Sequence, residues 1–340
     1  MSDKRLLILA EGYSGDPHYG KTARGVIRYG PDPVVALLDS ERAGETQDGI
    51  PIVATVDDAL CFDPTHALVG VATQGGRFPP AWRELLRSCI GKGLHVVSGL
   101  HEFLGDDPEL TELARRHDVT LTDLRRPPAD LNVPTGENLT HGARVVHTVG
   151  SDCAIGKKTM ALELDLEARR RGLASVFVPT GQTGIAIAGW GIAVDAVIAD
   201  FLAGAGERLV VEGARRGDLL WVEGQGAICH PLYSGVTLGL LHGCAPHALV
   251  LCHRPETTEI EGCPGHPIPP LPELVATYEA VSLPARRARV VAIALNTVEL
   301  GEDEARAAAA RIEAETGLVA DDPVRFGAAR LVDAVLASLR

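Results

Sequence analysis

Short apolar runs alternate with helical patterns along most of the 340-residue chain. In the first third, the apolar runs predict buried strands at residues 5–10, 33–39, 50–53, 66–71, 94–98 and 119–121. Helical patterns lie between them, at residues 20–29, 56–60, 80–91 and 108–117. Strands that alternate with helices indicate a parallel α/β sheet, which we expect to be Rossmann-like.

The same alternation returns in the second half. Strands are predicted at 145–150, 174–178, 219–222, 248–252 and 290–295, and helices at 160–171, 195–213, 303–316 and 328–339. Between the halves, residues 124–142 are rich in Pro, Gly, Asn and Asp and lack periodicity. We therefore predict a Rossmann-like domain over 1–123, a linker over 124–142 and a P-loop NTPase-like domain over 143–340. Both domains are expected to be doubly wound parallel sheets.

Composition narrows the class of protein. With 32 basic and 45 acidic residues, the net charge of −13 argues against nucleic acid as a partner, because phosphate binding favours a basic surface. No apolar run is long enough for a membrane span, and no signal-peptide pattern is present, so we expect a cytoplasmic protein. The seven scattered cysteines indicate reduced thiols. We expect a small-molecule substrate and a homo-oligomer.

The strongest candidate site follows the strand at 145–150. Five residues separate Gly150 from Gly156, and Lys157-Lys158-Thr159 then opens a helix, so the spacing is longer than a standard Walker A motif. A helix N-terminus after a glycine turn binds anions. The expected cofactor-binding residues are Gly150, Ser151, Asp152, Cys153, Gly156, Lys157, Lys158 and Thr159. This spacing resembles the loop of dethiobiotin synthetase and its relatives, whereas the plainer interpretation is an ordinary strand–turn–helix connection.

A second signal is Glu223, which ends the apolar run 219–222. An acidic residue at a strand end is the Walker B arrangement, in which the carboxylate reaches Mg²⁺. We therefore expect Thr159 and Glu223 to be the ligands if Mg²⁺ binds, although an incidental acidic strand end would look the same. His230 follows closely and is a candidate general base, or else a structural histidine.

Other polar segments are weaker candidates. Residues 180–184 predict a substrate or metal loop that includes Gln182, and Asp195 and Asp200 lie on the helix predicted to end near residue 213. Residues 15–22 formally satisfy the Walker A pattern, but Pro17 and the early helix stop at residues 30–31 disfavour a triphosphate site, and Lys21 remains a modest anion contact. The set Cys252, His253, Cys263 and His266 lacks zinc-site spacing.

Taken together, these motifs resemble a two-domain family with D-glutamate N-acetyltransferase activity. The resemblance covers nearly the whole chain and is carried by residues 19–23, 28–29, 98–101, 106–107, 150–159, 181–184, 195, 200, 223–226 and 230–231. It implies acetyl-CoA as co-substrate and D-glutamate or a related D-amino acid as acceptor. The acceptor amine needs a base, for which Glu223, Asp195, His230 and Asp152 are the candidates.

Alternatives to this activity stay open at this point. The dethiobiotin synthetase-like loop alone indicates an ATP- and Mg²⁺-dependent ligase or kinase, and a non-catalytic nucleotide sensor is a third possibility. Within the transferase interpretation, Cys153 could carry the acetyl group, since a helix N-terminus is expected to lower the pKa of its thiol. Direct transfer to the amine is the simpler route.

Overall fold

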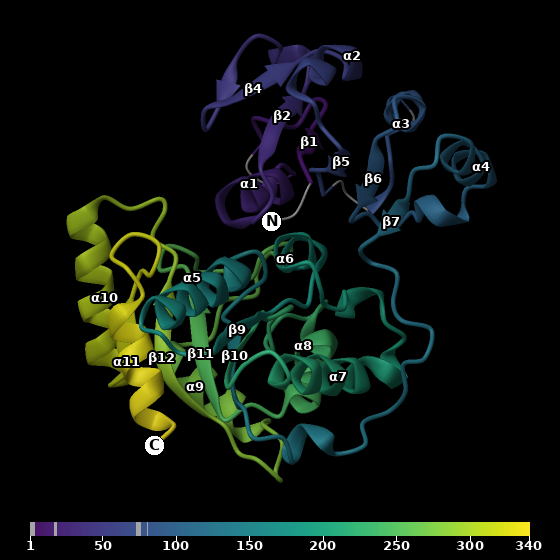
Figure 1. Ribbon diagram of the computed structural model, residues 1–340. Helices are drawn as coiled ribbons and strands as arrows, with labels where there is room; N and C mark the ends of the chain where they lie inside the picture. Colours follow the sequence, from purple (N-terminus) through teal and green to yellow (C-terminus); the bar gives the residue numbers. More distant parts are fainter. Residues whose placement is uncertain (1–3, 17–18, 73–75, 80) are drawn as a thin grey trace. The chain divides into compact units, whose positions relative to one another are not determined.

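The computed structural model describes residues 4–16, 19–72, 76–79 and 81–340, and the chain divides into two compact units (Figure 1). The N-terminal unit comprises Met1–Arg126 together with Ile185–Ala196, and the P-loop unit comprises Pro127–Gly184 together with Val197–Arg340. The N-terminal unit thus takes one segment from within the second half of the sequence. None of the described helices is long and apolar enough to cross a membrane.

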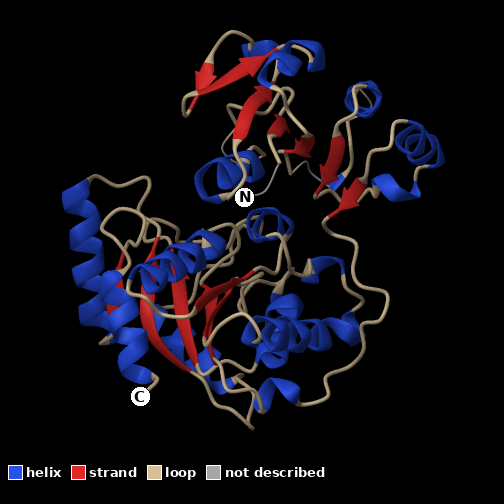
Figure 2. Ribbon diagram, viewed as in Figure 1, coloured by secondary structure: helices blue, strands red, loops and turns tan. Residues whose placement is uncertain are grey.

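A seven-stranded sheet forms the centre of the N-terminal unit, in the order β3-β4-β2-β1-β5-β6-β7 (Figure 2). Its strands are β1 (Leu6–Leu9), β2 (Val34–Leu38), β3 (Thr46–Gln47), β4 (Ile50–Val53), β5 (His66–Val69), β6 (His95–Ser98) and β7 (Leu121–Asp123). Every neighbouring pair is parallel except β3 and β4. The helices of this unit include α1 (Lys21–Tyr29), α2 (Val56–Ala59), α3 (Trp82–Gly91) and α4 (Pro108–Arg116).

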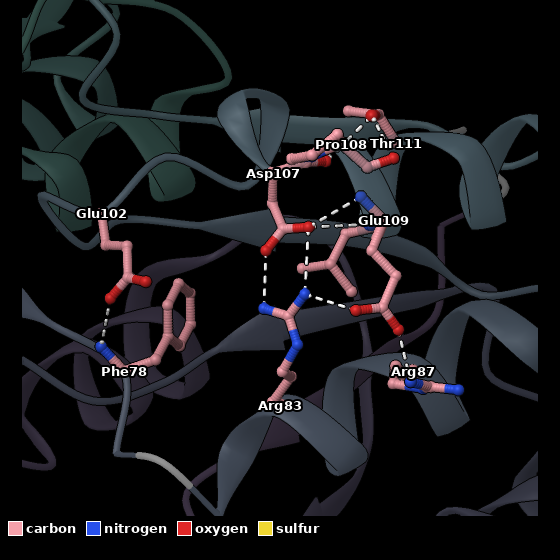
Figure 3. A network of polar contacts seen from close by, with 9 residues as sticks. Phe78, Arg83, Arg87, Glu102, Asp107, Pro108, Glu109 and Thr111 are labelled. Atoms are coloured by element: carbon pink, nitrogen blue, oxygen red, sulfur yellow. Dashed lines mark hydrogen bonds and ion pairs between the residues drawn. The ribbon is translucent and has the colours of Figure 1, made fainter.

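An exposed polar network joins α3 to α4 (Figure 3). Arg83 Nη1 lies 2.6 Å from Asp107 Oδ2, and Arg83 Nη2 lies 2.6 Å from Glu109 Oε2, while Glu109 also pairs with Arg87. Asp107 caps α4, because its Oδ1 accepts hydrogen bonds from the N–H groups of Glu109 and Leu110. Hydrogen bonding from Arg83 lowers the pKa of Asp107. Asp107 therefore has a structural role at this helix terminus.

A six-stranded parallel sheet forms the P-loop unit, in the order β13-β12-β11-β8-β10-β9. Its strands are β8 (Arg144–Gly150), β9 (Ser175–Val178), β10 (Leu219–Val222), β11 (Ala248–His253), β12 (Arg289–Leu295) and β13 (Val319–Asp321). Gly150 of β8 pairs with Cys252 of β11, and His147 of β8 pairs with Val222 of β10. The carboxyl ends of three neighbouring strands therefore meet at one edge of the sheet, where open α/β sheets bind ligands.

Helices cover both faces of this sheet (Figure 1). They are α5 (Lys157–Arg170), α7 (Leu202–Ala214), α8 (Ser234–Cys244), α9 (Leu271–Ala280), α10 (Glu302–Thr316) and α11 (Ala329–Ser338). α5 and α11 pack together on one face. On the other face, α8, α9 and α10 enclose a buried apolar cluster that includes Leu241, Tyr278 and Ile312. Burying such apolar surface is the main stabilising term for the unit.

The predicted fold class is confirmed, since both units are parallel-sheet α/β structures. Two local predictions are wrong. The helix predicted over 195–213 is divided, because Ile198 is extended between the 3₁₀ turns Val194–Ala196 and Ala199–Phe201, so that α7 begins only at Leu202. Residues 182–184 are not a loop but the start of α6 (Gln182–Ala188).

The segment predicted as a linker, 124–142, is ordered in its second half. It contains a 3₁₀ turn, Glu137–Leu139. The carboxylate of Glu207 on α7 accepts hydrogen bonds from the N–H groups of Thr135 and Gly136, at 2.6 and 2.7 Å. A long-range partner of this kind leaves no local trace in the sequence, which explains why the segment gave no periodic signal.

Candidate functional site

The loop between β8 and α5 is fixed by side chains from distant parts of the P-loop unit. Tyr278 on α9 donates its hydroxyl hydrogen to the carbonyl oxygen of Gly150 at 2.7 Å. Asn296, directly after β12, donates through Nδ2 to the carbonyl oxygen of Ile155 at 3.1 Å. These contacts hold both ends of the loop, so its backbone is set before any ligand arrives.

The loop ends at a helix N-terminus. Gly156 has a φ of 104°, in the left-handed region that favours glycine, and α5 begins at the next residue, Lys157. Gly156, the N-cap residue, has no side chain that could cap the first turn of α5. Lys158 and Thr159 lie half-buried in that turn. The uncapped N–H groups and the helix dipole make this turn suitable for an anion.

Lys157 is buried inside the loop, only 7% exposed, and its Nζ donates to the carbonyl oxygen of Asp152 at 2.6 Å. Burial lowers the pKa of this ammonium group, although nearby thiols and carboxylates oppose the shift. Two glycines make room for the side chain. A Cβ on Gly150 would lie 2.9 Å from Lys157 Nζ, and a Cβ on Gly224 would lie 2.9 Å from Lys157 Cδ and 1.8 Å from the oxygen of Thr148.

Asp152 and His230 connect the loop to a second loop, at residues 254–261. Asp152 Oδ1 accepts from the N–H of Cys153 at 2.6 Å, and Oδ2 accepts from the N–H of Glu261 at 2.8 Å. His230 Nδ1 accepts from the N–H of Leu232 at 3.2 Å, while Nε2 lies 3.1 Å from the carbonyl oxygen of Glu261. This pattern places the histidine proton on Nε2. Both side chains are 1% exposed.

Three of these side chains lie close enough to share a metal ion, which would have to displace two protons. One candidate ligand atom each from Asp152, Cys153 and His230 lies within 4.8 Å of the others. Metal ligation needs a bare imidazole nitrogen and a thiolate. However, His230 Nε2 carries the proton, and burial raises the pKa of the Cys153 thiol to about 11. The predicted lowering of that pKa is therefore wrong, and the thiol is protonated at neutral pH.

Glu223 follows β10 directly and is 6% exposed. Its Oε2 accepts from the N–H groups of Thr180 and Gly181, at 2.9 and 3.2 Å, and Thr180 Oγ1 donates to the carbonyl oxygen of Glu223 at 2.9 Å. A Cβ on Gly184 would lie 2.5 Å from Oε2. Glu223 thus positions the backbone that leads into α6, and a Mg²⁺ ion would have to use the other carboxylate oxygen.

The structure divides the predicted site residues between the two units. One group gathers at the carboxyl edge of the P-loop sheet: Gly150, Ser151, Asp152, Cys153, Gly156, Lys157, Lys158, Thr159, Gln182, Glu223 and His230. Asp195 belongs to the N-terminal unit, where it pairs with Arg125, and Arg125 Nε donates to the carbonyl oxygen of Gly99 at 2.6 Å. Lys21 is exposed at the start of α1 in the same unit.

Sequence reasoning missed two groups that shape the site. Tyr278 lies on a helix that was not predicted, because prolines at 264–270 obscured its start. Its one available signal was that it is a single aromatic residue in an otherwise aromatic-poor region. Glu261 contributes only its backbone N–H and carbonyl group, so its side-chain identity carried no signal at all.

Comparison with known proteins matches both halves of the chain to one family. Residues 39–127 match the Rossmann-like domain of unknown function DUF1611_N, and residues 132–332 match the P-loop domain DUF1611_C. A protein named D-glutamate N-acetyltransferase from Tritonibacter scottomollicae is 39% identical over 97% of this chain and 98% of its own length. Another of the same name from a Pseudoalteromonas species is 34% identical over 80% of each chain.

A solved structure extends this likeness to three dimensions. It is the crystal structure of a DUF1611 family protein from Anabaena variabilis ATCC 29413, whose sequence is 40% identical to this one. The two structures superpose with a TM-score of 0.93 over 98% of this chain and 100% of that chain. The relatives and the matched domains span both units. The chain therefore belongs to the DUF1611 family, which combines a Rossmann-like and a P-loop domain.

Proposed function

We propose that the protein is an N-acetyltransferase that moves the acetyl group of acetyl-CoA to the amino group of D-glutamate. The observation that carries this proposal is the similarity, over 97% of the chain, to a protein named D-glutamate N-acetyltransferase. N-acetyl transfer is the general part of the proposal. The acetyl-CoA donor and the D-glutamate acceptor are its specific parts.

The P-loop is the proposed binding site for the phosphates of coenzyme A. Coenzyme A carries a 3′-phosphate and a diphosphate, and the uncapped N-terminus of α5 offers N–H groups and a favourable dipole to either. Lys157 and Lys158 add positive charge at the same turn. A phosphate group near Lys157 Nζ would replace the carbonyl oxygen of Asp152 as its partner.

The acid–base group is harder to assign, because the predicted candidates already have partners. Attack on the thioester needs a deprotonated amine. Asp152 accepts from an N–H group at each oxygen, both ring nitrogens of His230 are engaged, and Asp195 pairs with Arg125. A lone pair that already accepts a hydrogen bond takes up a proton only if that bond is broken.

Glu223 remains the predicted residue on which turnover depends, and Glu223→Gln distinguishes its two roles. The amide oxygen of glutamine can still accept from the N–H groups of Thr180 and Gly181. A positioning role therefore predicts substantial remaining activity, with the acidic limb of the pH–rate profile unchanged. A base role predicts loss of activity and of that limb. Parental activity in both Glu223→Gln and Glu223→Ala would contradict any role in turnover.

Thiol release from acetyl-CoA tests the proposed function directly. The assay compares a panel of D- and L-amino acids, with ATP hydrolysis measured in parallel. We expect thiol release that depends on D-glutamate and needs no ATP. ATP turnover without thiol release would instead support the ligase or kinase alternative, and thiol release with other acceptors only would overturn the D-glutamate assignment.

A further inference from the structure

The turn that follows β11 carries two buried polar groups without partners. Thr257 N–H donates to the carbonyl oxygen of Arg254 at 3.1 Å, which closes a turn with Pro255 at its second position. Within the described residues, Arg254 Nε and both carboxylate oxygens of Glu256 are buried and have no hydrogen-bond partner. Arg254 Nη1 lies 3.6 Å from a carboxylate oxygen of the exposed Glu299.

This turn is attached to the P-loop at both of its ends. On the β11 side, the N–H of Ser151 donates to the oxygen of Cys252 at 3.0 Å, and Ser151 Oγ lies 2.9 Å from His253 Nδ1. On the other side, Asp152 Oδ2 accepts from the N–H of Glu261. Residues 254–260 therefore lie beside the loop that we assign to coenzyme A, within the same unit.

A buried carboxylate without a partner is costly, because neither water nor a donor compensates the lost hydration. A ligand that supplies a partner would remove this cost. Glu256 requires a cationic or hydrogen-bond-donating partner, and Arg254 Nε requires an acceptor. No ion pair joins the two, although they are separated only by Pro255. An α-amino acid carries an ammonium and a carboxylate on the same carbon, so it can satisfy both.

We infer that Arg254 and Glu256 form the binding site for the amino-acid acceptor, with the carboxylate on Arg254 and the ammonium on Glu256. This inference rests on the proposed function and extends it. The side chain of Arg254 is 30% exposed as a whole, whereas its Nε is buried. Among the glutamates at the P-loop edge, Glu223 already holds two backbone N–H groups, whereas both oxygens of Glu256 are available.

Glu256 then also accounts for the proton transfers. Its carboxylate takes one proton from the ammonium and later returns it to solvent. The freed amine forms a bond to the thioester carbonyl carbon, and the carbon–sulfur bond breaks. The second proton on the attacking nitrogen goes to the sulfur, which leaves as the coenzyme A thiol. The products are the N-acetyl amino acid and coenzyme A, so atoms and charges balance.

Steady-state kinetics with D-glutamate test this site. Glu256→Gln is expected to lower kcat/KM by roughly 100- to 10,000-fold, the range for losing a general base, because glutamine cannot take the proton from the ammonium. Arg254→Gln is expected to raise KM more than it lowers kcat, because Arg254 only binds. The control is Glu259→Gln, which changes an exposed glutamate of the same loop. Kinetics of Glu256→Gln within twofold of the parent would overturn the inference.

Thermal unfolding separates this role from a structural one. Removing an unpartnered buried charge relieves its desolvation cost, so Glu256→Gln is expected to melt no lower than the parent. A structural role would instead lower Tm and leave the kinetics of the remaining folded enzyme unchanged. That second outcome would contradict the inference.

Ligand-induced shifts in Tm keep the inference testable even if no acetyl transfer occurs. D-glutamate should raise the Tm of the parent but not of Glu256→Gln. If this holds while the parent releases no thiol, the proposed transfer fails and the amino-acid site stands. If Mg²⁺ or Zn²⁺ alone produces the Glu256-dependent shift, the site binds a metal ion and the inference fails. If no ligand shifts the parent, the inference also fails.

Discussion

Two loops in this protein follow a strand and end in Gly-Lys at the start of a helix, yet they use their backbones differently. In the N-terminal unit, the buried carboxylate of Asp39 accepts from the N–H groups of Gly12 and Ser14, at 3.2 and 3.1 Å. Lys21 lies exposed at the start of α1. In the P-loop unit, the lysine itself is buried and donates to a carbonyl oxygen of its own loop, although both helices begin after a glycine N-cap that has no side chain.

The comparison shows that the burial and contacts of the lysine are better evidence for a phosphate site than a match to the motif spacing. Residues 15–22 fit the Walker A spacing, but α1 ends after nine residues at Tyr29, and the N–H groups of Gly12 and Ser14, just before this stretch, already donate to Asp39. The loop at 150–157 departs from that spacing, but Gly150 and Gly224 leave room for the Lys157 side chain. This difference supports our proposal that the phosphates bind in the P-loop unit.

The largest expected effect is on stability and comes from Gly224→Ala. Its new Cβ would lie 1.8 Å from the backbone oxygen of Thr148, which cannot move without disturbing β8. We expect a loss of about 3 kcal/mol in the free energy of unfolding. The matched variant in the other loop is Gly15→Ala, whose Cβ would meet only Arg42 at 3.6 Å. Urea unfolding measures the free energy of unfolding of both variants. Equal losses of stability in the two variants would contradict the proposed difference between the loops.

Asp39→Ala should separate loop architecture from ligand binding. It removes the acceptor for two loop N–H groups, so we expect the N-terminal unit to lose about 1–2 kcal/mol of stability. Affinity for coenzyme A should not change, because we propose that the phosphates bind in the other unit. Calorimetric titration with coenzyme A and a urea melt on the same sample measure the two quantities. Weaker binding at unchanged stability would show that the first loop contacts the cofactor.

A smaller effect is expected from pH, through His253 beside the P-loop. Burial lowers the pKa of His253 from 6.5 to about 4. The unfolded chain therefore binds the proton more readily, so this contribution to stability is complete above pH 6.5 and is lost as the pH falls towards 4. Between pH 7 and 5.5 the loss is about 1 kcal/mol.

The variant His253→Asn should reduce this pH dependence. It keeps a polar group near Ser151 Oγ but removes the titration. His117→Asn, at the exposed end of α4, is the control and should leave the dependence as in the parent. Free energies of unfolding at pH 7 and 5.5 provide the measurement. If the free energy of unfolding of His253→Asn changed with pH as much as that of the parent, His253 would not be the group that titrates.

The sheet strands and the phosphate loop could be predicted from sequence because their signals are local. The apolar run before Gly150, the apolar run before Glu223 and the lysines at the start of α5 are read directly from neighbouring residues. Two helices of the P-loop unit, α8 and α9, could not be predicted in this way. α8 combines three glycines and three leucines with few polar residues, so it shows no helical stripe, and prolines conceal the start of α9.

The contacts of the site residues could not be predicted from the sequence. Asp195 was predicted to be a candidate base on a helix that ends near residue 213, whereas it lies in a 3₁₀ turn of the N-terminal unit, where it pairs with Arg125. The significance of Glu256 comes from a missing partner, and only atomic positions reveal that. Local pattern therefore located the phosphate loop but could not tell which polar side chains were already engaged.

The most direct test of the central claim is calorimetric titration of coenzyme A into the parent, Lys157→Ala and Lys21→Ala. Lys157 is buried in the loop that we assign to the phosphates, and Lys21 holds the equivalent position in the loop that we exclude. The account predicts that Lys157→Ala weakens binding by about 1.5–3 kcal/mol and that Lys21→Ala binds as the parent does. Unchanged affinity in Lys157→Ala, or a loss confined to Lys21→Ala, would contradict it.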